Sequence, residues 1–404
     1  MKSLSIIIVS YNVKRYLEQC LNSIYTQQDV DLQQVEVFVV DNFSKDGTIG
    51  HLRRKFPAKR FPGLHLIANK RNVGFGRANN QALHKAKGEY ILFLNPDTLL
   101  TEHTLHDALE EAALHDDLGA MGVKMLGSDG TFAPESRRGV PSPWTAFCKM
   151  SGLYHLAPKS RLFGRYYMQD LDKDQTAPID IVSGAFMLIP HKVLDEVGSF
   201  DESFFMYGED IDLSFRMLQN GRSNRYLPTP ILHYKGESTH KNSFHYVHVF
   251  YEAMLIFFRK HYKHYTLALS LPIKAAILMS AALSLTTHQC RMLRRFLYPR
   301  AFHRNSRMLY LGHAVGAINQ LAEEYGLDID CLDADAQSLP GGHASTNEIR
   351  QNTYLHIVYD LHDFSIAKVL SHFENANPTH CHIGTFNPSN GTLITGSKVY
   401  TLSD

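Results

Sequence analysis

Three apolar runs in the first hundred residues each end in polar side chains, and this repeated pattern most constrains the fold. Helix-like patterns separate the runs, an alternation typical of parallel βαβ units. Ligands of open α/β sheets bind at the carboxyl edge of the strands. The pattern therefore predicts an α/β fold with a mostly parallel central sheet and a ligand site at that edge. The runs and the residues after them are Leu4–Val9 with Ser10, Tyr11 and Asn12; Val35–Val40 with Asp41; and Tyr90–Leu94 with Asn95 and Asp97.

Charge divides the 404-residue chain into three regions, although the formal net charge is only +1. Residues 1–252 hold 28 basic and 29 acidic side chains, residues 253–307 hold ten basic and no acidic ones, and residues 308–404 hold three basic and eleven acidic. We expect a neutral domain, a basic helical segment and a small acidic domain with these boundaries. The near-neutral total argues against a nucleic-acid partner.

The five cysteines are widely spaced and include no C-x-x-C pair, which argues against a disulfide framework or a zinc ribbon. The chain passes from Met1 directly into a strand-like run with no signal-peptide pattern. We therefore expect a cytoplasmic protein.

Two loops at the predicted edge suit a nucleotide. The loop that starts at Asp41 is rich in hydrogen-bonding groups, which favours either an Asx turn or a helix cap, or recognition of a base or ribose. The loop around Asn72 and Gly74 precedes a helix-like pattern and contains two arginines. Backbone amides at a helix start, with arginine nearby, suit a diphosphate.

Asp97 and His233 are candidate metal ligands. A single carboxylate together with substrate phosphates is enough to anchor Mg²⁺ or Mn²⁺, because such ions keep several water ligands. The alternatives are that Asp97 caps the helix predicted near Thr101 and that His233, one of 23 histidines, is structural.

Glu209 and Asp210 stand at the start of a predicted helix, after a run of Phe, Met and Tyr. Carboxylates are favoured at a helix N-terminus by the helix dipole, so the pair could be a capping arrangement. The alternative is a general base that accepts the proton of an attacking hydroxyl. A continuous strand is predicted before this helix, over Asp180–Pro190.

Residues 1 to about 250 resemble family 2 glycosyltransferases of the nucleotide-diphospho-sugar (GT-A) fold, especially the rhamnosyltransferase-like branch. Several motifs in this order carry the resemblance. They are Ile6–Asn12, Val39–Thr48, Asn72–Asn80, Leu94–Asp97, Ser183–Phe186 and Gly208–Leu213.

The resemblance implies an inverting transferase that uses a nucleotide-sugar donor, dTDP-rhamnose or a UDP-sugar, and a lipid-linked saccharide acceptor for bacterial surface polysaccharide. It also implies Mg²⁺ or Mn²⁺ as cofactor. Asn95 departs from the family pattern, because many members have Asp there. The implied roles are nucleotide-sugar binding by Ser10, Tyr11, Asn12, Asp41, Asn72, Gly74 and Asn95; metal binding by Asp97 and His233; catalysis by Asp210 with Glu209; and acceptor-side contacts by Gly184 and Asp212.

The basic segment contains an apolar stretch, 265–287, interrupted only by Lys274 and flanked on both sides by basic clusters. A single crossing of the bilayer would leave one cluster on the wrong side. We therefore expect helices on the anionic inner leaflet of the cytoplasmic membrane, as a peripheral attachment. The alternative is a helical hairpin packed on the catalytic domain.

Residues 308–404 restart the α/β alternation and predict a small Rossmann-like domain. Gly312 and Gly316 lack the full G-x-G-x-x-G fingerprint, which argues against a dinucleotide site. The domain could bind a ligand, dock another pathway enzyme or act as a scaffold. Two other function classes stay open for the whole chain: a non-catalytic nucleotide-sugar-binding relative and a membrane-associated scaffold.

Overall fold

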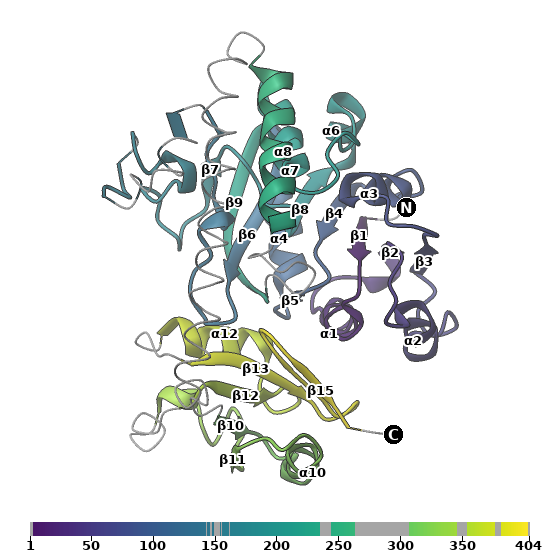
Figure 1. Cartoon of the computed structure of the whole chain (residues 1–404), viewed down its shortest axis with the longest axis vertical. Coiled ribbons are helices and arrows are strands. Elements are labelled where there is room, and N and C mark those ends of the chain that lie inside the picture. Colours follow the sequence, from purple (N-terminus) through teal and green to yellow (C-terminus); the bar gives the residue numbers. More distant parts are fainter. Residues whose placement is uncertain are drawn as a thin grey trace.

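The structure is a computed structural model in which a larger α/β domain lies beside a smaller C-terminal one (Figure 1). The predicted membrane-surface stretch, 265–287, lies outside the residues that it describes. Those residues are 3–142, 144–145, 148, 154, 156–160, 162–234, 244–262, 307–345, 354–375 and 381–402.

The sheet of the larger domain has nine strands in the order β3-β2-β1-β4-β8-β6-β9-β5, with β7 paired to β9. Strands β1 to β4 are parallel, as predicted, whereas β5, β7 and β8 run antiparallel to their neighbours, so the whole sheet is mixed. The strands are β1 (Leu4–Ser10), β2 (Val35–Asp41), β3 (Leu64–Ala68), β4 (Tyr90–Leu94), β5 (Thr98–Leu100), β6 (Leu118–Leu126), β7 (Ala177–Ile179), β8 (Phe186–Pro190) and β9 (Ser223–His233).

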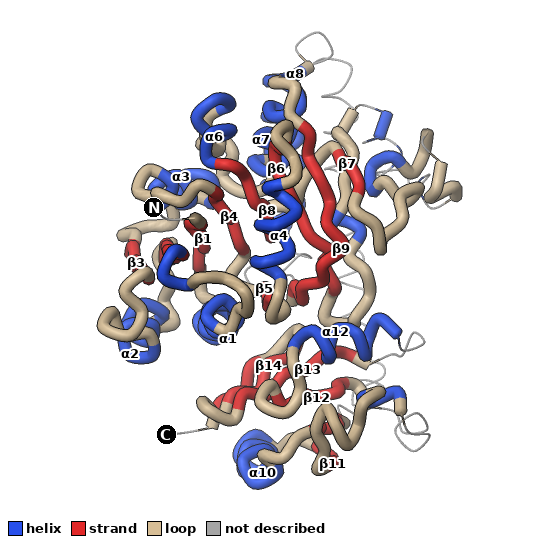
Figure 2. Tube along the Cα trace, turned by 180° about the vertical axis from the view of Figure 1, so that it is seen from behind, coloured by secondary structure: helices blue, strands red, loops and turns tan. Residues whose placement is uncertain are grey.

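Helices cover both faces of this sheet (Figures 1 and 2). Helices α1, α2 and α4 bury their apolar sides on one face, and α3, α6 and α7 do so on the other. In α1 the buried Leu17, Leu21 and Ile24 recur at helical spacing, which explains why this segment is a helix. The helices are α1 (Lys14–Tyr25), α2 (Thr48–Lys55), α3 (Phe75–Leu83), α4 (Thr104–Ala113), α6 (His191–Val197), α7 (Glu209–Gln219) and α8 (Phe244–His261), with short 3₁₀ turns η1 (Leu32–Gln34), η2 (Pro134–Ser136) and η4 (Arg165–Tyr167).

The prediction of one strand over Asp180–Pro190 is wrong. The chain forms β7 and β8 with an irregular segment between them. Two side chains of α7 bind the backbone of that segment: the Ser214 hydroxyl accepts the Val182 N–H, and the Asp210 carboxylate accepts the Gly184 N–H. These contacts replace the ladder hydrogen bonds that a continuous strand would need.

Helix α8 crosses the predicted domain boundary at residue 252 and packs on α7 through a buried aromatic and aliphatic cluster. Its Lys260 donates hydrogen bonds to Asp201 at 2.6 Å and to Asp212 at 3.1 Å. Lys260, which we expected to face lipid as part of a basic cluster, therefore binds the larger domain instead.

The C-terminal domain has a six-stranded sheet in the order β11-β10-β12-β13-β14-β15. Its first four strands are parallel and the last two are antiparallel. The strands and helices are β10 (Met308–Leu311), α10 (Val315–Tyr325), β11 (Ile329–Leu332), η7 (Gly342–Ala344), β12 (His356–Asp360), α12 (Ile366–Asn375), β13 (His382–Asn387), β14 (Thr392–Thr395) and β15 (Val399–Thr401).

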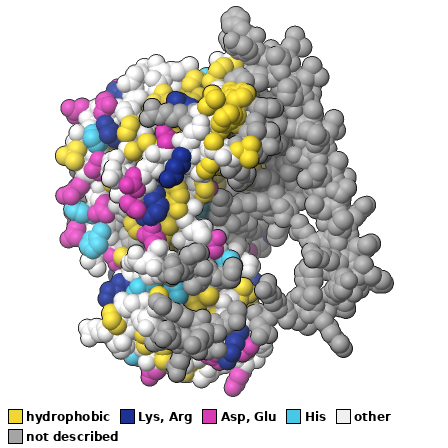
Figure 3. Space-filling view, turned by 90° about the vertical axis from the view of Figure 1, so that its left-hand side faces the viewer, with side chains coloured by type: hydrophobic (Ala, Val, Ile, Leu, Met, Phe, Trp, Pro, Cys, Tyr) yellow, Lys and Arg dark blue, Asp and Glu magenta, His cyan; other side chains and the backbone are white. Residues whose placement is uncertain are grey.

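The surface facing the viewer in Figure 3 mixes acidic and basic side chains over both domains. Within the described ranges, every helix is too short or too polar to cross a bilayer.

Candidate active site

Strands β1 and β2 end side by side at Ser10 and Asp41, which are paired in register. Both residues are buried. The Ser10 hydroxyl and Oδ1 of Asp41 have no hydrogen-bond partner in the described part of the chain, while Oδ2 of Asp41 accepts the Ser44 N–H at 3.2 Å. Burial raises the pKa of Asp41. Buried polar atoms without partners are uncommon, so this edge is suited to a polar ligand.

Asn12 shapes the loop that borders Asp41. Its backbone is left-handed, with φ of 57°, its N–H donates to the Ser44 hydroxyl at 2.9 Å, and its Oδ1 accepts the Lys45 N–H at 2.7 Å. The neighbouring Tyr11 ring stays 37% exposed. Asn12 is therefore used to join the two loops, whereas Tyr11 offers an aromatic surface beside them.

Asn42, which we did not predict as a site residue, holds the loop of Asn72 and Gly74. Its Nδ2 donates to Oδ1 of Asn72 at 2.8 Å, and its Oδ1 accepts the Val73 N–H at 3.0 Å. Gly74 has φ of 89°, and a Cβ there would stand 2.7 Å from the Phe205 carbonyl oxygen. The loop thus lies against the segment that leads into α7. The adjacency of Asn42 to Asp41 was the signal in the sequence.

Asp97 and His233 meet because β5 pairs with β9, with Thr98 opposite His233. Oδ1 of Asp97 lies 3.4 Å from Nε2 of His233, and the two side chains are 6% and 10% exposed. Nδ2 of Asn95 lies 3.5 Å from the same His233 nitrogen. The structure therefore brings together all three residues expected at the metal and donor end of the site.

This pair fits a divalent cation that shares its coordination with a substrate. Among the described positions, no three His, Cys, Asp or Glu side chains form a metal-binding group. A carboxylate oxygen and an imidazole nitrogen are donors that divalent cations accept, and those of Asp97 and His233 lie 3.4 Å apart. Nδ1 of His233 is buried without a partner among the described residues. Water and phosphate oxygens would complete the shell.

Asp210 stands in the first turn of α7, next to the irregular segment between β7 and β8. Its Oδ2 accepts hydrogen bonds from the Gly184 N–H at 3.1 Å and from Nη2 of Arg138 at 2.5 Å. Asn95 donates its N–H to the carbonyl of Ala185 at 2.9 Å. Residues 184 and 185 therefore connect Asp210 to the loop that bears Asp97.

Arg138 is a second residue that the sequence interpretation missed. Burial alone would lower its pKa, but the nearby Asp210 carboxylate outweighs burial and raises it. The guanidinium stays charged and orients the Asp210 carboxylate. Arg138 lies 72 positions before Asp210 in the chain, so no local pattern could reveal the pair.

Glu209 lies in a different environment from Asp210. Its side chain is buried, and its Oε2 has no partner in the described ranges. Burial, and then the charge of Asp210, raise the pKa of Glu209 to about 8. Glu209 therefore holds a proton at neutral pH, and a protonated carboxyl cannot accept another.

Asp212, expected on the acceptor side, points elsewhere. It is fully buried, and its carboxylate binds Arg216 at 2.8 Å and His261 at 2.8 Å. Lys260 lies 2.9 Å from Oδ1 and 3.1 Å from Oδ2 of the same carboxylate. Asp212 fastens α8 to α7 and does not join the group formed by Asp97, His233 and Asp210.

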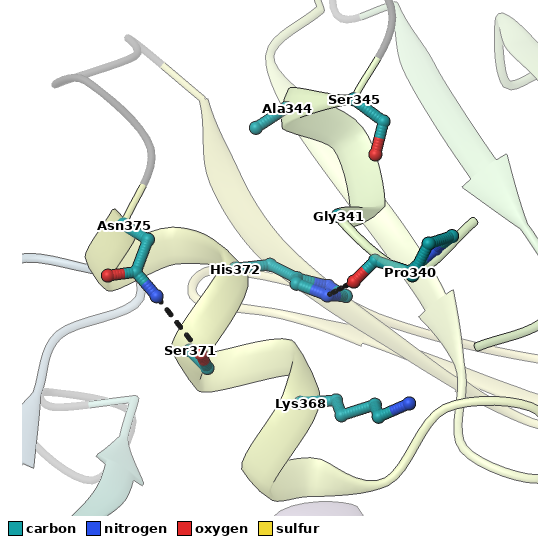
Figure 4. A pocket seen from close by; sticks show the side chains of 8 residues that line it. All are labelled: Pro340, Gly341, Ala344, Ser345, Lys368, Ser371, His372 and Asn375. Carbon is teal, nitrogen blue, oxygen red and sulfur yellow. Dashed lines mark hydrogen bonds between the residues drawn. The ribbon is translucent and has the colours of Figure 1, made fainter. Parts of the chain in front are cut away.

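A separate cavity of about 420 Å³ lies in the C-terminal domain between η7 and α12 (Figure 4). Lys368, Ser371, His372 and Asn375 line it from one side of α12. None of the predicted site residues takes part in it.

The family model described as "Glycosyl transferase family 2" matches residues 5–198. This region belongs to that family. The match includes the residues from Ser10 to Gly184, whereas Asp210 and His233 lie beyond it. The glycosyltransferase fold predicted from the sequence motifs is thereby confirmed.

Two curated relatives of this glycosyltransferase are named as rhamnosyltransferases. The N-acetylglucosaminyl-diphospho-decaprenol L-rhamnosyltransferase of Mycobacterium tuberculosis is 27% identical over 253 residues, 58% of this chain and 77% of the relative. Rhamnosyltransferase WbbL of Escherichia coli is 28% identical over 243 residues, 55% of this chain and 80% of the relative. The mannosyltransferase PcManGT of Pyrobaculum calidifontis, solved with GDP-Man and Mn²⁺, has 19% identity and a TM-score of 0.44, with 73% of this chain and 81% of that one covered.

Proposed function

We propose that this glycosyltransferase moves a sugar from a nucleoside-diphospho-sugar to a hydroxyl of a lipid-linked saccharide, with inversion at the anomeric carbon, in bacterial surface polysaccharide synthesis. One observation carries the proposal: residues 184 and 185 bind both Asp210 and the Asn95 backbone. A candidate base and a candidate metal pair are thereby held at one edge of the sheet.

The nucleoside lies against the ends of β1 and β2. The unpartnered atoms of Ser10 and Asp41 are suited to the hydroxyls and ring nitrogens of a ribose and base. The exposed Tyr11 ring provides a surface on which a base can stack. The loop of Asn72 and Gly74, fixed by Asn42, borders the diphosphate and the donor sugar.

Asp97 and His233 would hold the divalent cation, Mg²⁺ or Mn²⁺. When bound, this ion neutralises charge on the departing nucleoside diphosphate. Asn95, which is 3.5 Å from His233, contributes a neutral amide where other family members place a carboxylate. The ligands of the cation would therefore depend on the diphosphate for much of their negative charge.

Asp210 is the general base. Its carboxylate accepts the proton of the acceptor hydroxyl, whose oxygen then attacks the anomeric carbon from the face opposite the leaving group. Arg138 and the Gly184 N–H hold the carboxylate in place. Because Glu209 is protonated near neutral pH, it serves as a neutral neighbour that does not compete for the proton.

The relatives support the proposed acceptor class and donor. Two rhamnosyltransferases, one named for a prenyl-diphospho-linked acceptor, are among the matching proteins. They support dTDP-rhamnose, or a UDP-sugar, as the donor and a prenyl-diphospho-saccharide at the inner leaflet as the acceptor. A peripheral position on that membrane, through the basic segment 253–307, belongs to the same proposal.

The test is a transfer assay with the full chain, prenyl-diphospho-N-acetylglucosamine as acceptor, and a panel of dTDP- and UDP-sugars with Mn²⁺ or with EDTA. We expect transfer from one donor with Mn²⁺, loss of transfer with EDTA, and loss in Asp97→Asn. Absence of transfer from every donor, with nucleotide binding retained, would support a non-catalytic binding protein instead.

A further inference from the structure

The C-terminal domain is packed tightly onto the glycosyltransferase domain. One buried apolar cluster contains side chains of both domains, among them Tyr16, Leu126 and Tyr234 from the first and Phe373 and Ile394 from the second. The two domains therefore share a continuous core, which limits their relative motion.

Polar contacts surround this core. Both carboxylate oxygens of Glu102 accept backbone N–H groups at the start of α12, from Ile366 at 2.6 Å and Ala367 at 3.1 Å. Lys124, only 6% exposed, binds Glu374 at 2.5 Å. Buried charged contacts of this kind are costly to break, so the C-terminal domain has one fixed position against the active-site domain.

At the centre of the interface, the Thr385 hydroxyl on β13 joins two elements of the glycosyltransferase domain. It accepts a hydrogen bond from Nε2 of Gln19 on α1 at 2.6 Å and pairs with the Tyr234 hydroxyl at 2.9 Å. Thr385 is 1% exposed, Tyr234 is 2% exposed and Gln19 is 7% exposed. No solvent can replace these bonds, so their loss would leave polar atoms unpaired.

Both elements lead directly to the active site. Tyr234 follows His233, and its N–H donates to the Asp97 carbonyl at 3.0 Å. The Tyr16 ring of α1 packs against the Tyr234 ring with centroids 5.3 Å apart. Helix α1 begins at Lys14, immediately after the loop that contains Asn12 and follows Ser10 at the end of β1.

We propose that Thr385 is a positioning residue for glycosyl transfer: its hydroxyl aligns the end of β9, which bears His233, with α1, which follows the nucleotide loop. The C-terminal domain thereby supports the active site through its contacts with α1 and with the residue that follows β9. This inference rests on the proposed function, because it takes Asp97 and His233 as the metal pair. Groups that hydrogen-bond a metal ligand directly change metal affinity by about 10- to 100-fold when they are removed. Thr385 acts through Tyr234, the residue after His233, so we expect the lower end of this range.

The test compares Thr385→Val, which removes the hydroxyl at similar volume, with Thr385→Ser, which keeps it. Mn²⁺ binding in the presence of UDP is measured by calorimetry, and the Mn²⁺ concentration for half-maximal transfer is measured in parallel. For Thr385→Val we expect Mn²⁺ binding about 10-fold weaker or more, with donor KM at saturating Mn²⁺ within about two-fold of wild type, because the donor-binding residues stay in place. Thr385→Ser should restore wild-type Mn²⁺ binding.

Thr395→Val is the matched control. Thr395 is also 1% exposed and lies on the adjacent β14, but its hydroxyl bonds within the C-terminal domain, to Lys398. It should lower stability without weakening Mn²⁺ binding. If Thr385→Val does not fold, Tyr234→Phe removes the partner hydroxyl and carries the same expectation.

The outcomes separate the two proposals. Wild-type Mn²⁺ binding in folded Thr385→Val or Tyr234→Phe, or equal weakening in Thr395→Val, would overturn the positioning role of Thr385. A different result would overturn the proposed function: Thr385→Val weakens Mn²⁺ binding, but the wild-type protein transfers no sugar. That result would still support a role for Thr385 in positioning Asp97 and His233.

Discussion

Replacing Glu209 by Gln should change how the stability of this protein depends on pH. Burial and the neighbouring Asp210 raise the pKa of Glu209 from 4.5 to about 8. The folded protein therefore binds this proton more tightly than the unfolded chain does. The resulting stabilisation is full below pH 4.5 and is lost as the pH rises towards 8. Glutamine is neutral at every pH and has nearly the same shape.

The magnitude follows from the shift. Each unit of pKa difference corresponds to about 1.4 kcal/mol. Between about pH 5.5 and about pH 7.5, both inside the interval, the wild type should lose roughly 2 to 3 kcal/mol of unfolding free energy relative to Glu209→Gln. A difference of this size is a large part of the total stability of a typical domain.

Urea unfolding of both proteins at a series of pH values measures the difference directly. Glu323→Gln is the control, because Glu323 is exposed on α10. Its difference from wild type should stay nearly constant over the same range. The reasoning is refuted if the difference between wild type and Glu209→Gln is also constant, since Glu209 would then ionise alike in the folded and unfolded states.

Two further predictions concern the base and the domain contact. Asp210→Asn should lower kcat by a factor of about 10² to 10⁴, while UDP binding measured by calorimetry stays unchanged. The control Asp201→Asn changes another ion-paired carboxylate and should keep near-normal kcat. Near-normal turnover in Asp210→Asn would contradict the assignment of Asp210 as the general base. Glu102→Ala should lower the unfolding free energy by about 0.5 to 2 kcal/mol, because the first N–H groups of α12 lose the carboxylate that accepts them. Urea unfolding identical to wild type would show that this contact contributes nothing to stability.

The local sequence pattern determined the elements that carry the site. The runs that became β1, β2 and β4 are almost entirely apolar because both faces of these strands are buried. The buried polar exceptions in β1 and β2 are Ser5, whose hydroxyl donates to Glu36 at 2.6 Å, and Glu36 itself. The polar residue after each run then falls at one edge of the sheet. The start of α7 at Glu209 was also predictable, because carboxylates and helical apolar spacing mark a helix N-terminus.

The sequence was less informative where one stretch of chain depends on another. The apolar residues of Asp180–Pro190 predict a continuous strand, but contacts from α7 interrupt it at Gly184. The strands β13, β14 and β15 were not predicted, because short strands carry weak periodicity and these are stabilised by pairing.

The sequence alone determined the α/β alternation and the polar residues at the sheet edge, since both follow from local periodicity, and the order of its motifs carries the resemblance to glycosyltransferases. Only the tertiary structure decided the environment of each carboxylate. Asp210 pairs with Arg138, and Asp212 pairs with cations of α7 and α8. Glu209 is buried, and its Oε2 has no partner among the described residues. These three carboxylates lie within four positions of one another, yet their charge states and contacts differ. The physical reason is that desolvation and ion pairing depend on groups brought from distant parts of the chain.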